Sequence, residues 1–346
     1  MNEMTHISPI QEEIHVVLSP WDLSDSYNRH AGVTIESLLE HCSLPTTIHL
    51  LYDNRLGSGD DEGIEFNKSC YSEIVENYNS KLQFHHVDLP GWVSEMPATK
   101  QFTVGTLLRL QLPELLQNID KILYLDCDMV VLTDISSLWK INIEEYYLAA
   151  CIDTGFENLG KITKRYWQKR GIPINNYFNA GIMMLNLKKL RESSFSTKAF
   201  EYMDTHRDIR LLDQDVLNWF CQSNYLRLDE RYNVFSQRSD VQSYLKDCIL
   251  HYSSGSTKPW NVYSGPVDEY YWDYLIRTPW CKTELQLISY VRSAPDIIKS
   301  RKLLAKNFPT YIVGSNSHKL VESLKFTLSM WLSIIMKGID IIKRNL

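Results

Sequence analysis

Short apolar runs alternate with longer amphipathic stretches through the first 280 residues of the chain. Short runs rich in β-branched and aromatic residues predict buried strands, and apolar residues three or four apart predict helices. We expect strands at residues 14–19, 48–52, 82–87, 121–126, 148–152, 181–187 and 248–252. We expect helices at 30–41, 103–116, 188–206 and 213–221, and a flexible connection at 57–63.

This alternation predicts an α/β fold, with a mainly parallel sheet and helices on both of its faces. In such sheets, ligands bind beyond the carboxyl ends of the strands. Polar residues that follow the expected strands are therefore the first places to search for chemistry.

Two carboxylates stand at the end of the expected strand 121–126, where Asp126 and Asp128 flank Cys127. Side chains two residues apart in an extended chain project to the same side. Two carboxylates that close repel each other unless a proton or a cation lies between them. Mg²⁺ and Mn²⁺ take such oxygen ligands and often share them with phosphates. A polar strand end with an Asp cap would contain the same residues, so both interpretations stay open here.

Two other short motifs carry polar side chains. FNAG at 178–181 offers small residues that let the backbone approach a ligand, and Asn179 has donor and acceptor atoms. In LDQD at 212–215, Asp213 stands where it could cap a helix, and Gln214 would lie in the first turn at the mouth of a cleft. A simple turn and a helix N-cap explain these motifs equally well.

The last expected strand, 248–252, carries a histidine, His251, next to its end, and Gly255 and then Lys258, Pro259 and Trp260 follow it. A neutral imidazole can complete the coordination of Mn²⁺. A lysine in a Gly/Ser loop suits a phosphate group. A single histidine is usually structural, but this combination is much less common.

The composition is that of an ordinary soluble globular protein, with 44% apolar and 23% charged residues. The net charge of −6 argues against nucleic-acid binding. The seven cysteines show no paired metal-binding spacing, and the polar start of the chain lacks the apolar segment of a signal peptide. We therefore expect free thiols and a cytoplasmic location.

Charge divides the chain into an acidic body with a net charge of −12 over residues 1–282 and a basic tail with +6 over 283–346. We expect a catalytic domain at 1–282 and a basic helical tail at 283–346. From Lys319 onward, polar and apolar positions form opposite faces of a helix. The uncharged stretch between Lys325 and Lys337 is eleven residues long, too short to span a bilayer. The tail either packs on the body or lies on the anionic inner leaflet of the membrane as a peripheral contact.

Taken together, the motifs resemble the signature set of family-8 glycosyltransferases. These retaining, metal-dependent enzymes include bacterial lipopolysaccharide galactosyl- and glucosyltransferases and glycogenin. The stretch 123–130, FNAG, LDQD and the block from His251 to Trp260 follow the family's order, and the similarity spans roughly residues 14 to 262. The resemblance implies a GT-A nucleotide-sugar-binding fold. It also implies transfer of a hexose, glucose or galactose, from a UDP-sugar to a glycan or glycolipid acceptor in surface polysaccharide or lipopolysaccharide synthesis.

The resemblance assigns a role to each matching residue. Asp126, Asp128 and His251 would bind Mn²⁺, or Mg²⁺, which bridges the donor's two phosphates. Lys258 would neutralise the leaving diphosphate, with the backbone of Gly255 near it. The residues assigned to the sugar and the donor are Asn179, Ala180 and Gly181 in the sugar pocket, Asp213 on a sugar hydroxyl, Gln214 facing the anomeric carbon, and Arg109 reaching the donor.

Two departures from the family pattern leave questions open. The spacing from His251 to Gly255 is one residue longer than the usual His-x-x-Gly. The N-terminal nucleotide-binding segment usually has Asp-Asp-Asn-Tyr after a strand, and here residues 19–27 differ. Either Asp22 or Asp25 would contact the uracil.

The chemistry of Gln214 favours one of the two ways in which the configuration of the anomeric carbon can be retained. Double displacement needs a nucleophile beside the anomeric carbon, and an amide oxygen is a poor one. Front-face attack by the acceptor, assisted by the departing diphosphate, is the more economical hypothesis.

Two rival functions remain at this point. Haloacid-dehalogenase-like phosphatases also carry Asp-x-Asp after an apolar strand, with the first Asp as nucleophile and Mg²⁺ as cofactor. That motif usually opens its domain, whereas more than 100 residues precede Asp126 here. The other rival, a non-catalytic nucleotide-sugar-binding module, is disfavoured because all three expected metal ligands are present.

Overall fold

The computed structural model describes residues 12–283 except 24, 26, 54–60, 101–103, 254–257 and 262–265, together with residues 286 and 290. The chain divides into two units, the first ending at Ser253 and the second beginning at Ser254. The predictions for Gly255 and for the tail beyond residue 290 lie outside the described residues. The domain boundary expected after residue 282 stays a prediction.

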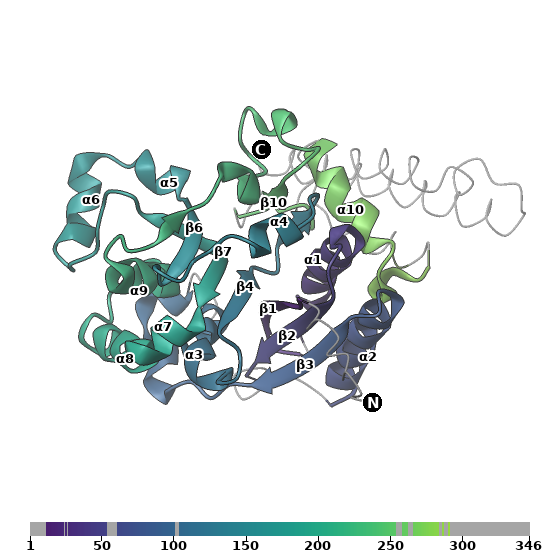
Figure 1. The fold of residues 1–346 in the computed structure, drawn as a ribbon, viewed down its shortest axis with the longest axis horizontal. Helices are drawn as coiled ribbons and strands as arrows, with labels where there is room; N and C mark the ends of the chain where they lie inside the picture. Colours follow the sequence, from purple (N-terminus) through teal and green to yellow (C-terminus); the bar gives the residue numbers. More distant parts are fainter. Residues whose placement is uncertain are drawn as a thin grey trace, which may run out of the picture. The chain divides into compact units, whose positions relative to one another are not determined.

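Within the described residues, the first unit contains a mixed sheet of seven strands in the order β3-β2-β1-β4-β7-β6-β8 (Figure 1). Strands β3, β2, β1 and β4 run parallel, β7 runs antiparallel to β4 and β6, and β8 runs parallel to β6. The expected mainly parallel sheet is therefore confirmed. The strands are β1 (Ile14–Trp21), β2 (Thr46–Tyr52), β3 (Lys81–His86), β4 (Lys121–Leu125), β6 (Leu148–Ile152), β7 (Phe178–Asn186) and β8 (Leu226–Arg227).

A second, smaller sheet brings the last strand of this unit, β10, close to the paired aspartates. It consists of β5 (Met129–Val131), β10 (Ile249–His251) and β9 (Val234–Phe235). Strand β10 pairs antiparallel with β5, so that His251 lies opposite Met129, and it pairs parallel with β9. This register places His251 beside the residue that precedes β5, which is Asp128.

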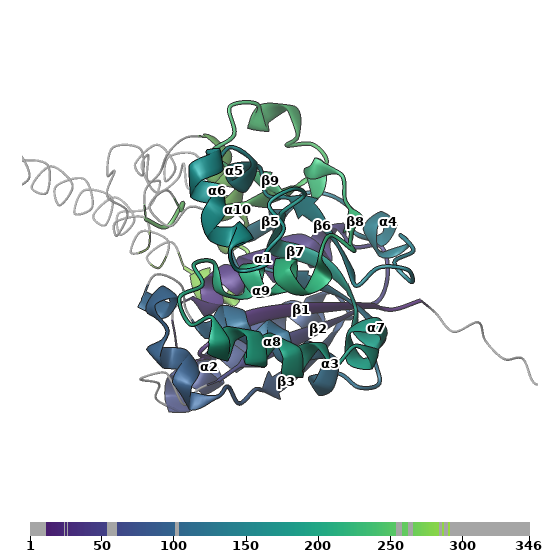
Figure 2. The same ribbon diagram turned by 90° about the vertical axis from the view of Figure 1, so that its left-hand side faces the viewer.

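Helices cover both faces of the large sheet, as the alternating pattern predicted. Figure 2 shows β5 and α1 on one side of β1, with α3 and α8 on the other. Helix α1 contacts β5, and helix α9 contacts β7. The helices of the first unit are α1 (Asn28–His41), α2 (Asp61–Asn77), α3 (Leu112–Leu115), α4 (Ser136–Trp139), α5 (Thr154–Glu157), α6 (Lys161–Gln168), α7 (Leu187–Glu192), α8 (Phe195–Thr205) and α9 (Leu212–Cys221).

Short 3₁₀ helices complete the described elements. In the first unit they are Gly91–Glu95, Pro97–Lys100, Val104–Gln111, Glu230–Tyr232 and Val241–Ser243. The second unit contains α10 (Glu269–Leu275) and the 3₁₀ helices Pro266–Asp268 and Pro279–Cys281.

Three expected segments differ from the structure. The helix expected at 103–116 is a 3₁₀ helix that continues into α3, where Pro113 has no amide hydrogen to donate. The helix expected at 188–206 is two helices, because Ser194 adopts a left-handed conformation with φ 54° between α7 and α8. The connection expected at 57–63 ends early: α2 begins at Asp61, whose carboxylate favours a helix N-terminus.

Apolar strands form the core of the first unit. The side chains of β4 and β7 are almost all buried, which fits central strands covered on both faces. All seven cysteines are free thiols. Among the described residues we find no helix that combines the length and the apolar character needed to cross a bilayer.

Candidate active site

Asp126, Asp128 and His251 converge at one point, as the motifs predicted. Their ligand atoms all lie within 4.8 Å of one another. His251 Nε2 is 3.4 Å from Asp128 Oδ1 and 3.9 Å from Asp126 Oδ2. The expected reason was wrong, however: β4 ends at Leu125, and the two aspartates lie in the three-residue link between β4 and β5, which bends at Cys127 and Asp128, rather than on one extended strand. Their side chains meet because the chain turns there and β10 pairs with β5.

The surroundings of this group fit a divalent cation. Two carboxylates and one imidazole form a donor set that suits Mn²⁺. Burial raises the pKa of Asp126; the charge of Arg109 lowers it, and the nearby Asp128 carboxylate raises it again. Gly181 makes the convergence sterically feasible, since a Cβ there would lie 2.5 Å from His251 Cε1 and 3.1 Å from Asp126 Oδ2. A metal ion would relieve the repulsion between the carboxylates.

Asn233 orients the imidazole of His251. The Nδ1 of His251 donates to Asn233 Oδ1 at 2.8 Å, and Asn233 Nδ2 donates to Asn179 Oδ1 at 2.8 Å. Because Asn179 Oδ1 also accepts from the Gly181 amide at 2.9 Å, both amide orientations are determined by their partners. Nε2 of His251 therefore presents its lone pair to the metal site, as metal-binding histidines usually do. Asn233 was not predicted, since it belongs to no motif and reaches the site only because β9 pairs with β10.

Arg109 links the carboxylates to the FNAG strand. Its guanidinium donates to Asp126 Oδ1 and to the Ala180 carbonyl, both at 2.8 Å, and lies 3.3 Å from Asp213 Oδ2. It also stacks on the Tyr124 ring, 4.0 Å from the ring centre. Burial opposes the positive charge, yet the neighbouring carboxylates raise the pKa of Arg109 above its ordinary value. Arg109 is therefore a permanent cation that holds Asp126 in place.

Asp213 is not a helix cap. Helix α9 begins at Leu212, its N-cap is Leu211, and Asp213 lies in the first turn with its carboxylate facing Arg109. Burial raises the pKa of Asp213 to about 6, and the Arg109 charge opposes that rise. The N-cap alternative is therefore wrong, and the buried carboxylate points into the site instead.

A hydrogen-bonded cluster joins Gln214, Asn179 and Asp153. Gln214 Oε1 accepts from the Ala180 amide at 3.0 Å and from Asn179 Nδ2 at 3.2 Å. Gln214 Nε2 donates to Asp153 Oδ2 at 3.0 Å, and Asn179 Nδ2 lies 3.3 Å from the same oxygen. FNAG lies inside β7 rather than before a strand, so these groups are carried by a rigid element. Asp153 was not predicted; it follows β6 directly and caps α5, a weak signal.

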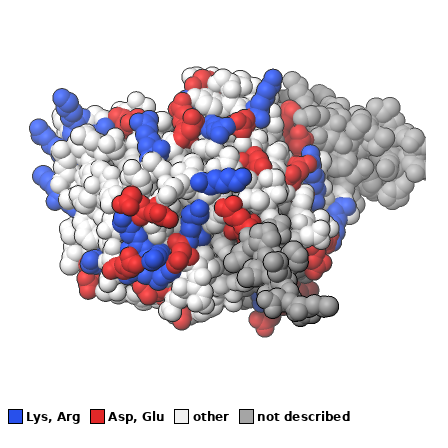
Figure 3. All heavy atoms as spheres, in the orientation of Figure 1, with Lys and Arg blue, Asp and Glu red and all other residues white. Residues whose placement is uncertain are grey.

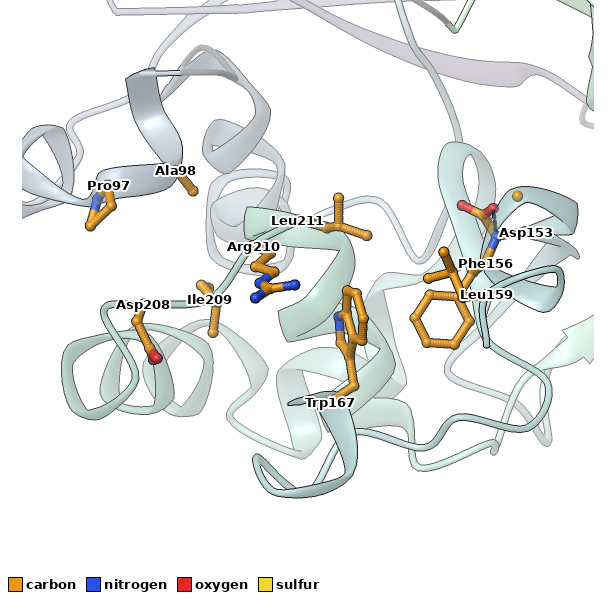
Figure 4. Close-up of a pocket in the computed structure, with 11 residues that line it drawn as sticks. Pro97, Ala98, Asp153, Phe156, Leu159, Trp167, Asp208, Ile209, Arg210 and Leu211 are labelled. Carbon is orange, nitrogen blue, oxygen red and sulfur yellow. Dashed lines mark hydrogen bonds between the residues drawn. The ribbon is translucent and has the colours of Figure 1, made fainter. Parts of the chain in front are cut away.

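A cavity of about 590 Å³ adjoins this cluster (Figure 4). Asp153 lies at one end, and an aromatic wall is formed by Phe156 and Trp167, whose rings meet edge to face at 4.9 Å. Arg210 and Leu211 lie between this wall and Asp208 in Figure 4. The volume falls within the range of small-ligand sites, roughly 300–1,000 Å³.

The remaining predicted site residues keep their roles as predictions. Asp22 is buried, and the Asp25 carboxylate accepts from the Tyr27 amide at 3.2 Å, so the residue that contacts the base stays open. Lys258 belongs to the second unit, where its Nζ lies 5.3 Å from the centre of the Trp260 ring.

Comparison with known proteins identifies the family. Residues 21–263 match the family described as glycosyl transferase family 8. The chain belongs to this family. It is therefore a glycosyltransferase, and nothing supports the phosphatase or the non-catalytic alternative.

Relatives and solved structures agree with this assignment. A Haemophilus influenzae protein named as a glycosyltransferase is 30% identical over 51% of this chain. The match covers 52% of that relative, about half of its length. The lipopolysaccharide 1,3-galactosyltransferase of Salmonella typhimurium is 26% identical over 61% of this chain and 65% of its own length. The solved structure of the galactosyltransferase LgtC, in complex with donor and acceptor sugar analogues, matches with a TM-score of 0.63 and 20% identity. That match covers 78% of this chain and 96% of LgtC, which confirms the GT-A fold.

Proposed function

We propose that this family-8 glycosyltransferase moves a hexose from UDP-glucose or UDP-galactose to a hydroxyl of a glycan or glycolipid acceptor, with retention of configuration. The convergence of Asp126, Asp128 and His251 beside Arg109 is the observation that carries the proposal. These three residues would hold Mn²⁺, which would neutralise charge on the donor's diphosphate. The similarity to the Salmonella enzyme supports an acceptor in surface polysaccharide or lipopolysaccharide, and UDP-sugar use supports a cytoplasmic site of action.

The residues around the metal group prepare it for the donor. Arg109 keeps Asp126 pointed at the site, and Asn233 keeps Nε2 of His251 available. Such preorganised groups stabilise developing charge without having to rearrange during the reaction. Lys258, through its ammonium group, is proposed to meet the leaving diphosphate.

The Gln214 cluster supports front-face attack. The Gln214 carbonyl oxygen already accepts two hydrogen bonds, and an amide is a poor nucleophile. We assign Gln214 to stabilising positive charge on the sugar ring, with Asn179, Ala180 and Gly181 lining the sugar pocket and Asp213 holding a sugar hydroxyl. Gln214→Ala should then lower the rate without abolishing transfer. A variant that binds donor normally but transfers nothing would favour a covalent role instead.

The cavity beside the cluster is our proposed acceptor site. Asp153 belongs both to the Gln214 cluster and to the cavity wall, so an acceptor seated there would reach the donor sugar. Apolar and aromatic walls with a few polar groups are usual for such sites.

A donor assay separates this proposal from its rivals. The chain is incubated with UDP-glucose or UDP-galactose and simple hexosides, with Mn²⁺ or with EDTA, and UDP and glycoside product are measured. We expect Mn²⁺-dependent UDP release and an α-linked product by the anomeric NMR coupling. A β-linked product, or donor binding with no UDP release under any condition, would contradict the proposed reaction.

A further inference from the structure

Two cations flank the aromatic wall of the proposed acceptor cavity. The Arg210 guanidinium carbon lies 4.1 Å from the centre of the Tyr166 ring and 5.7 Å from that of Trp167. Lys164 does not line the cavity itself, but its Nζ lies 5.4 Å from the centre of the Phe156 ring, which does. Cations that pack on aromatic faces keep their charge available to a further partner on the open side.

The two carboxylates that line the cavity, Asp208 and Asp153, are already engaged elsewhere. Asp208, at the end of the cavity, pairs with Arg170. Asp153 accepts from Gln214 and from the Phe156 amide at 2.8 Å. Among the described residues, neither Arg210 nor Lys164 forms an ion pair with any of them; Lys164 donates only to the Glu157 carbonyl, at 2.9 Å.

Asp215 lies next to Arg210, but the hydrogen bonds of its carboxylate go to other groups than the Arg210 side chain. Its carboxylate is completely buried and accepts from Trp167 Nε1 at 2.8 Å and from the Tyr177 hydroxyl at 2.6 Å. The backbone amides of Arg210 and Leu211 donate to its other oxygen. Asp215 therefore positions the cavity wall and the Arg210 backbone, while the Arg210 side chain is exposed.

The helix that supplies Trp167 extends the positive charge beyond the cavity. In α6 and the residue that caps it, Lys161, Arg165 and Lys169 are exposed, and none forms an ion pair within the part of the chain that the structure describes. Figure 3 shows basic side chains projecting from the edge where Figure 1 places α6, with little acidic surface between them. Beside them, Ile162 is 81% exposed.

From this arrangement we infer that the acceptor is an anionic saccharide. A carboxylate or phosphate group close to the accepting hydroxyl would be held by Arg210 in the cavity wall, and Lys164 would add positive charge nearby. Further negative groups of a longer chain would meet the basic side of α6. Arginine suits this role because its planar donors match carboxylate and phosphate oxygens. The inference rests on the proposed function, since it names the acceptor class of the same site.

Matched acceptor pairs test it. Transfer is measured to methyl glucoside and methyl glucuronide, and to methyl glucoside and its 6-phosphate, at low salt with Mn²⁺ and the active UDP-sugar. We expect kcat/KM for at least one anionic member to exceed that of its neutral partner by about tenfold, as for a hydrogen bond to a charged group. The preference should shrink as salt is added. The two pairs distinguish carboxylate from phosphate recognition.

Single substitutions test whether Arg210 and Lys164 cause the preference for anionic acceptors. Arg210→Gln and Lys164→Gln should each reduce the anionic-to-neutral ratio several-fold, and Arg210→Lys should retain part of it. Because the ratio compares two acceptors on one protein sample, a partial loss of folded protein cancels. Lys140→Gln, in a different surface cavity, is the matched control and should leave the ratio within about twofold.

The outcomes separate this inference from the proposed function. Mn²⁺-dependent transfer with an anionic-to-neutral ratio near one overturns the inference and leaves the function standing. A preference for anionic acceptors that persists in the Arg210→Gln, Lys164→Gln double variant would also overturn the inference and leave the function standing. If changing the α6 lysines weakens binding to anionic vesicles without altering the acceptor ratio, the basic surface serves a membrane and the inference also fails. Absence of UDP release with every acceptor contradicts the function itself.

Discussion

Gly181→Ala tests the packing that brings the metal ligands together. The added Cβ would lie 2.5 Å from His251 Cε1, whereas carbon atoms pack at about 3.5–4.0 Å. Neither side yields easily: the Gly181 carbonyl accepts from the Asp126 amide at 2.8 Å, and the buried imidazole is hydrogen-bonded to Asn233. The ring must therefore move by about 1 Å.

This displacement should affect stability modestly and metal binding strongly. Overpacking of a buried site costs about 1–3 kcal/mol. Loss of ligand orientation lowers metal affinity by roughly 10–100-fold. Titration calorimetry with Mn²⁺ in the presence of UDP measures the affinity, and urea unfolding measures the stability. Gly91→Ala is the control, because a Cβ at Gly91 meets nothing within 4 Å.

One result would refute this reasoning. If Gly181→Ala binds Mn²⁺ as tightly as the unaltered chain, at equal stability, then His251 is not held against β7 in the way described. A loss of affinity in Gly91→Ala of the same size would show that the assay reports general damage.

Three other changes follow from the same contacts. Asn233→Leu, which removes the acceptor of the His251 Nδ1 hydrogen, should weaken Mn²⁺ binding about 10–100-fold in the same calorimetric titration. Burial lowers the pKa of His49 to about 3, below the ordinary value near 6.5. Between these two pH values His49 is therefore protonated in the unfolded chain and neutral in the folded chain. The free energy of unfolding is therefore unaffected by His49 above about pH 6.5 and falls as the pH drops toward 3. Urea unfolding should show a loss of about 2 kcal/mol between pH 7 and pH 5 from this residue. His49→Leu should remove this contribution to the pH dependence of stability. Asp215→Ala leaves its buried donors without an acceptor and should cost more than about 3 kcal/mol of unfolding free energy by denaturant titration; a cost below 1 kcal/mol would contradict the described network.

Much of the fold was predictable from the sequence because its strands are continuous apolar runs. Strand β6 has the expected bounds, and β2 and β4 differ from expectation by a few residues at their ends. The three-residue strand β5 was missed, since so short a run has no periodicity of its own. The break at Ser194 was missed for a different reason: the amphipathic pattern continues across it, and only the backbone conformation stops the helix.

Some residues of the candidate site were likewise predictable from the sequence, and others were not. Asp126, Asp128 and His251 were predicted because each stands in a motif. Asn233 and Asp153 were not, because a lone polar residue at a strand end or a helix cap is common in any loop. Their roles depend on strand register and on side-chain hydrogen bonds, which arise only in the folded chain.

The cavity beside the Gln214 cluster could not be predicted at all. Its walls come from the 3₁₀ helix Pro97–Lys100, from α5 and α6, and from the segment before α9. No pattern within any of these segments indicates that they meet.

The central claim is that metal-dependent sugar transfer occurs at Asp126, Asp128 and His251. The most direct measurement is UDP release and product formation from the active UDP-sugar by the Asp126→Asn, Asp128→Asn double variant, with Mn²⁺-dependent UDP binding measured in parallel. We expect both activities to be lost while the circular dichroism spectrum of the folded chain is retained, since these carboxylates face one another in the site. A folded double variant that turns over at the rate of the unaltered chain would contradict the claim.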